Sequence, residues 1–142
     1  MRTLIFLILV ACVVGACFAY VVPERPLEKR IADADVVFIG TVTGVAPDPG
    51  RNGYFEFATF HVNSVLKGDV GPSVRLVSVD SIHELSPGCC VVGHTYLVIG
   101  KRTAKEDLLR SVDGRFGVFD VAAEDGKAGS LTWPGATFGG RL

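Results

Sequence analysis

The four cysteines are the residues of this chain whose chemistry depends most on their spacing. Cys89 and Cys90 are adjacent, whereas Cys12 and Cys17 lie near the amino terminus. Two adjacent thiols lack the spacing of a paired zinc clamp, so no metal site is predicted. A disulfide between neighbours is strained, because the favoured Cα separation in disulfides exceeds the distance between consecutive Cα atoms. If the mature chain retains Cys17, this residue is an alternative partner for Cys89 or Cys90.

The histidines form no catalytic or metal-binding pattern. His61, His83 and His94 contain no i, i+4 pair and stand among polar or turn residues, so we expect surface histidines. Asp33 and Asp35 lie close together in the sequence, and we expect them to be solvated or capping. The sequence contains no nucleophile elbow, phosphate-binding glycine loop or zinc-protease helix motif. It therefore predicts a protein that is not an enzyme and uses no cofactor.

Residues 1–19 have the order of a secretory signal peptide. Arg2 gives a basic start, Leu4–Val14 is apolar apart from the small Cys12, and small residues follow up to Ala19. The expected location is therefore secreted, periplasmic or in the cell envelope, where disulfides persist.

The cleavage position stays open between several alternatives. A cut after Ala19 places Tyr20 first, whereas a cut after Ala16 leaves Cys17 as the first residue. The sequences before Cys12 and Cys17 also resemble lipoprotein signals, and a lipidated cysteine would tether the product to a membrane. An uncleaved anchor is the remaining alternative, since about 20 apolar residues span a bilayer. Contact with a membrane is expected only through such a lipid or an uncleaved signal.

Composition narrows the class of protein. Of the 142 residues, 49% are hydrophobic and 20% are charged, which indicates one folded domain and not a disordered chain. The formal net charge is −1, so the basic surface expected of a nucleic-acid-binding protein is missing. The 17 glycines favour turns and bulges over long helices.

The elements that position these residues are mostly β-strands. We expect a short helix within 23–34 and strands over 36–45, 54–66, 74–79, 96–99 and 108–112. Asp113-Gly114 suggests a tight hairpin into a further strand over 116–121. The pattern fits a small closed barrel, with a sandwich as the alternative. We divide the chain into the signal 1–19, a domain over 20–125 and an irregular, glycine-rich tail over 126–142.

Three segments, taken in order, resemble one family. They are the strand-like Ala32–Val42, the alternating run Phe60–Gly68 that ends in Lys-Gly, and Cys89–Lys101, which carries Gly93 before a Tyr-Leu strand. Together they are similar to netrin-like domains, the domains of tissue inhibitors of metalloproteinases and their bacterial single-domain relatives. The resemblance covers Pro23–Val112, and it implies an OB-type five-stranded closed barrel.

The resemblance also implies a binding site. In these inhibitors an N-terminal cysteine binds the zinc of a metalloproteinase through its amine and carbonyl, and a disulfide joins it to the loop before the Tyr-Leu strand. Transferred by motif, that cysteine is Cys17, bonded to Cys89 or Cys90, and the partner-binding loop is Ser86, Pro87, Gly88, Cys89 and Cys90. We therefore expect an exported protein-binding module, similar to a metalloproteinase inhibitor, whose partner is a protein such as a zinc metalloproteinase. Because the inhibitors' Cys-x-Cys start is missing, the alternative is an envelope-associated structural barrel or lipoprotein without inhibitory activity.

Overall fold

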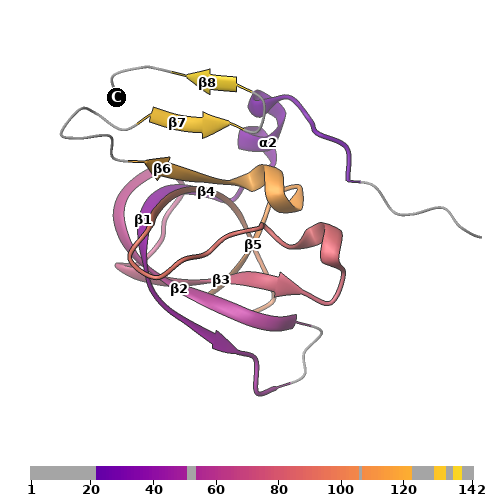
Figure 1. Cartoon of the computed structure of the whole chain (residues 1–142), viewed down its shortest axis with the longest axis vertical. Helices are drawn as coiled ribbons and strands as arrows, with labels where there is room; N and C mark the ends of the chain where they lie inside the picture. Colours follow the sequence, from indigo (N-terminus) through magenta and orange to yellow (C-terminus); the bar gives the residue numbers. More distant parts are fainter. Residues whose placement is uncertain (1–21, 51–53, 106, 123–129, 134–135, 139–142) are drawn as a thin grey trace, which may run out of the picture.

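The computed structural model describes residues 22–50, 54–105, 107–122, 130–133 and 136–138. This part of the chain is mostly β-structure, as predicted, with one short α-helix (Figure 1). The elements in chain order are α2 Leu27–Asp33, β1 Val36–Pro47, β2 Tyr54–Lys67, β3 Ser73–Asp80, the 3-10 turn η1 His83–Leu85, β4 Thr95–Arg102, β5 Leu108–Ser111, the 3-10 turn η2 Gly114–Gly117, β6 Val118–Ala122, β7 Ser130–Trp133 and β8 Ala136–Phe138.

Five strands pair in a closed ring. The order is β1-β2-β3-β5-β4, and β4 pairs again with β1, so each of the five has a neighbour on both sides. Every pair in the ring is antiparallel except β3 and β5, which run parallel and pair at two positions. The ring agrees with the predicted five-stranded closure, and Figure 1 shows β6, β7 and β8 extending the sheet beyond it. Closure leaves few unpaired strand edges within the ring.

Strand β1, which pairs with both β2 and β4, is irregular around a glycine. Its register with β2 shifts between Ile39 and Gly40 and again between Val42 and Gly44. A Cβ at Gly40 would lie 2.9 Å from the carbonyl oxygen of His61, so only glycine lets the two strands approach at this bend. The register shift at this glycine agrees with the bulges that the glycine content of the chain predicts.

The main core fills the inside of the ring. Alternate residues of the strands point inward, as the two-residue period of a strand requires. Two smaller clusters lie outside the ring: one lies between β1, β4 and β6 and includes Ile99 and Phe119, and the other includes Phe57 and Leu108. The inner cluster consists of Val36, Phe38, Val42, Ala58, Phe60, Val74, Leu76, Tyr96, Val98, Leu109 and Val118.

Helix α2 is held to the ring by two cations. Arg30 is fully buried, and its guanidinium donates to the carbonyl oxygen of Phe116 and lies 6.0 Å from the ring centre of Phe119. Burial lowers the pKa of Arg30. Lys67, at the end of β2, donates from Nζ to three carbonyl oxygens at the end of the helix, those of Ile31 (2.7 Å), Ala32 (3.1 Å) and Ala34 (2.7 Å). Because the last carbonyls of a helix lack partners within it, this ammonium acts as a C-terminal cap.

The Lys-Gly pair of the sequence motif therefore has a structural role. Gly68 has φ +74°, and a Cβ there would lie 2.2 Å from the carbonyl oxygen of Asp35. Only glycine fits this position. The close approach brings the end of β2 against the helix–strand junction and places Lys67 at the carboxyl end of α2.

Two sequence predictions need correction. Asp113 and Gly114 do adopt left-handed backbone angles (φ 57° and 58°), but no hairpin forms between the strands that flank them. The chain continues into η2, and β6 pairs with β4, so that Phe116 and Phe119 are buried. The tail over 126–142 is also less irregular than predicted, because β7 and β8 within it pair with β6 and with each other.

Candidate functional site

The predicted partner-binding loop lies between η1 and β4, and its first half is held inside the fold. Pro87 is buried, and the Oγ of Ser86 accepts a hydrogen bond of 3.0 Å from the backbone N–H of Asp80, the last residue of β3. Gly88 is exposed with φ +69°, a left-handed conformation that glycine adopts without strain. Ser86 and Pro87 thus act as anchors of the loop, and only Gly88 of these three residues reaches solvent freely.

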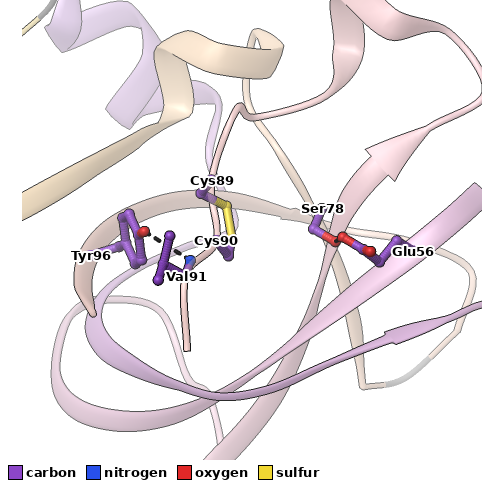
Figure 2. Close-up of a disulfide and its surroundings, with 6 residues drawn as sticks. All are labelled: Glu56, Ser78, Cys89, Cys90, Val91 and Tyr96. Carbon is purple, nitrogen blue, oxygen red and sulfur yellow. Dashed lines mark hydrogen bonds between the residues drawn. A yellow bond between two sulfur atoms is a disulfide. The ribbon is translucent and has the colours of Figure 1, made fainter. Parts of the chain in front are cut away.

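The sulfur atoms of Cys89 and Cys90 are bonded to each other (Figure 2). The bond from Cys17 to one of them, implied by the family resemblance, is not formed in this structure, because both sulfurs are already used; Cys17 itself lies outside the described residues. The two half-buried cysteines pack against the inner core together with Val62 and Val70. Packing of the two bonded cysteines against the core thus holds the middle of the loop in place.

The residues that follow the disulfide face solvent while their backbone is fixed. Val91 and Val92 are 56% and 58% exposed. The backbone N–H of Val91 donates to the hydroxyl of the buried Tyr96 at 3.0 Å, a contact drawn in Figure 2. Gly93 then donates to the carbonyl of Val42 at 2.8 Å, so the turn into β4 is bonded to β1. Two adjacent valines are therefore presented on a rigid support.

Sequence reasoning ended the binding loop at Cys90 and missed these two valines. A signal was available, because an apolar pair between a cysteine and a glycine turn has no strand of its own in which to be buried. From here on, the disulfide loop means residues 86–92. Its solvent-facing part is Gly88, Val91 and Val92; Pro87 is buried, and the two cysteines are half-buried.

Two buried polar side chains of β3 have hydrogen-bond partners. Ser78, which is buried, donates from Oγ to Glu56 at 2.9 Å, and Figure 2 shows these two side chains pointing toward one another. Asp80 is also buried and accepts from the guanidinium of Arg110 at 2.6 Å. Both contacts join neighbouring strands of the ring, β2 with β3 and β3 with β5.

The histidines are all exposed, as expected, and His94 lies 3.2 Å from a carboxylate oxygen of Asp120. Within the described ranges, no group of three or more histidine, cysteine or acidic residues is arranged to hold a metal ion. The described residues also include no helix that is long and apolar enough to span a membrane.

Comparisons with known proteins leave the family open. No model of a known protein family matches the chain. An alignment 138 residues long, gaps included, is 27% identical to the DNA-directed RNA polymerase subunit beta of Nitratidesulfovibrio vulgaris (strain DSM 19637 / Miyazaki F). The match includes 81% of this chain but spans only about a tenth of the length of that relative (10%). It therefore carries no argument about what this chain binds.

Proposed function

We propose that this protein is an exported protein-binding module, similar to a metalloproteinase inhibitor, and that it docks through the disulfide loop. The order of residues 1–19 supports export, and the three motifs that resemble the inhibitor family lie on neighbouring strands, because β1 pairs with both β2 and β4. Two of them also have a visible structural role, in the bend at Gly40 and in the cap formed by Lys67.

The observation that carries the proposal is the exposure of two adjacent valines on a fixed backbone. The hydrogen bond to Tyr96 and the adjacent disulfide already fix the backbone next to Val91 and Val92 in the free protein. Binding a partner therefore orders this backbone little further. Preorganisation of this kind lowers the entropic cost of association. Burying one valine against a partner contributes roughly 1.5 kcal/mol, which corresponds to about tenfold in affinity.

The experiment measures binding and inhibition against a panel of secreted zinc metalloproteinases. The mature protein is immobilised, each protease is passed over it, and cleavage of a fluorogenic peptide is followed in parallel. The test variant is Val91→Asp with Val92→Asp. The control is Phe55→Asp, which alters an even more exposed residue (62%) at the other end of the β1–β2 pair, beyond Pro47.

We expect saturable binding to at least one protease, with affinity reduced more than about tenfold by the double variant and unchanged by Phe55→Asp. Inhibition together with binding would identify the inhibitory form of the function. No binding across the panel at about 10 µM protease would refute the metalloproteinase partner, and the structural, envelope-associated barrel would become the better reading. Equal losses in the two variants would refute the assignment of the surface.

A further inference from the structure

The Cys89–Cys90 bond differs from a structural cross-link because it joins neighbouring residues and encloses no loop of the chain. In the chain-entropy model the stabilisation by a disulfide grows with the number of residues that it encloses, so a bond between neighbours stabilises the fold least. The fold is also closed by other means, since each of the five ring strands pairs on both sides. The effect of this bond is therefore expected to be local to the disulfide loop.

The segment just before Val91 depends on this bond for its position. Within the part of the chain that the structure describes, Gly88, Cys89 and Cys90 make no hydrogen bond. The first hydrogen bond after them is that of the Val91 N–H with Tyr96. The contact that holds the segment is the packing of the two bonded cysteines against the inner core. A change at the two sulfur atoms therefore changes what fixes this part of the loop.

The pair lies where a thiol from solvent can approach it. Cys89 and Cys90 are half-buried, so each keeps part of its surface in contact with water. Their neighbours along the chain, Gly88 and Val91, are both exposed, and Gly88 has no side chain to cover the cysteines. Thiol–disulfide exchange begins when a thiolate attacks a sulfur atom, and exposed disulfides are therefore more labile than enclosed structural ones.

We propose that Cys89 and Cys90 form a reversible redox site, which a dithiol reductant opens and a disulfide oxidant closes by the reverse exchange. A thiolate of the reductant attacks one sulfur of the bond, and the electron pair leaves on the other cysteine, which takes up a proton. The second thiol of the reductant loses its proton and displaces the first cysteine from the mixed disulfide, and this cysteine is protonated in turn. The pair thereby gains two electrons and two protons, and the reductant becomes a cyclic disulfide. This inference requires the Cys89–Cys90 bond and does not depend on the docking function.

Opening the bond changes the loop and leaves the ring intact. Two thiols cannot remain within bonding distance, so at least one sulfur leaves its position against the inner core. Because residues 88–90 have no hydrogen bonds of their own in the described structure, their backbone moves with that sulfur. Val91 and Val92 follow directly, and the reduced protein presents them on a less constrained backbone. The strand pairs of the ring do not involve these residues and stay as they are.

The experiment treats the isotopically labelled mature protein, purified without reductant, with excess dithiothreitol and then with oxidised glutathione. Alkylation followed by mass spectrometry gives the state of each cysteine, backbone amide shifts report the loop, and thermal unfolding reports the fold. The control is the double variant Cys89→Ala with Cys90→Ala, which cannot form the bond. It keeps Cys12 and Cys17 wherever the mature chain retains them, so it separates their reactions from those of the pair.

We expect complete reduction of the pair in the folded protein, amide shifts concentrated at residues 86–93, and a melting temperature lowered by no more than about 6 °C. Oxidised glutathione should restore the first spectrum, and the control should show no change at these residues with either reagent. A bond that resists dithiothreitol until the protein unfolds would overturn the proposal, as would two free thiols in the untreated protein. Reduction that unfolds the ring would make the bond a structural cross-link, and reduction that leaves the amides of residues 88–92 unshifted would remove its effect on the loop; either result overturns the proposal.

Discussion

Replacing Lys67 by methionine should destabilise the fold far more than the same change at another lysine nearby. The Lys67 ammonium caps helix α2 by donating to the carbonyl oxygens of Ile31, Ala32 and Ala34 at 2.7, 3.1 and 2.7 Å. Methionine keeps the length and apolar stem of the side chain but removes the charge and all three donors. The last carbonyls of the helix then lose their protein partner.

The expected loss is about 2 kcal/mol, because a well-placed cation at a helix C-terminus contributes up to about that amount when partly buried. For a domain of this size such a loss lowers the melting temperature by about 10 °C. The control is Lys29→Met, in the same helix, where the side chain is exposed. Thermal unfolding followed by circular dichroism measures both variants under identical conditions.

The reasoning would be refuted if Lys67→Met and Lys29→Met melted within about 2 °C of each other. That result would show that water caps the helix as well as Lys67 does. It would also remove the structural explanation of the Lys-Gly motif at Lys67 and Gly68.

Two further predictions concern the turns and the acid side of the stability curve. Gly114→Ala should lower the free energy of unfolding by about 3 kcal/mol, because φ is +58° and the new Cβ would lie 2.4 Å from the carbonyl oxygen of Glu84. Gly93→Ala, where φ is +88° but the surrounding space is open, should lower it by only about 1 kcal/mol. Urea unfolding measures both variants. The hydrogen bond from Arg75 lowers the pKa of Asp107 below its ordinary value of 3.8. This ion pair therefore stabilises the folded state fully above the ordinary pKa, and its contribution is lost as the pH falls through the lower pKa of the folded state. Carboxyl NMR titration should therefore show a higher Asp107 pKa in the Arg75→Met variant, and an unchanged midpoint would contradict the pairing.

Much of the fold was predictable because it depends on local patterns. Alternating and β-branched runs marked β1 to β5, and Gly40 marked the bend. The closure of the ring was less accessible, because it depends on a parallel contact of only two residue pairs between β3 and β5, which are far apart in sequence. The resemblance to a known family, and not the periodicity, supplied that expectation.

The Asp113-Gly114 turn shows how tertiary contacts override a correct local signal. The backbone adopts the left-handed angles that such a pair favours. However, β5 pairs with β4 only from Gly100 to Arg102, so Tyr96–Val98 is open to pairing with β6, and burying Phe116 and Phe119 around Arg30 outweighs the formation of a local hairpin.

The candidate site was predictable only in part. The loop over 86–90 was predicted from the family resemblance, but the exposed Val91 and Val92 that follow it were not. Exposure of Val91 and Val92 depends on where Tyr96 and Val42 hold the backbone, and neither contact can be seen in the sequence. The ion pairs of Arg25 with Asp33 and Asp113 join separate segments of the chain, and they too cannot be seen in the sequence.

The proposed function depends on export of the chain and on the Cys89–Cys90 bond, and one measurement tests both. The full-length protein is recovered from its native host, and its N-terminal sequence and intact mass are determined with and without reduction and alkylation. We predict a chain that has lost its signal residues and has no thiol open to alkylation at Cys89 or Cys90 before reduction. A chain that retains Met1 and is alkylated at both cysteines without reduction would contradict the proposed export and the Cys89–Cys90 disulfide.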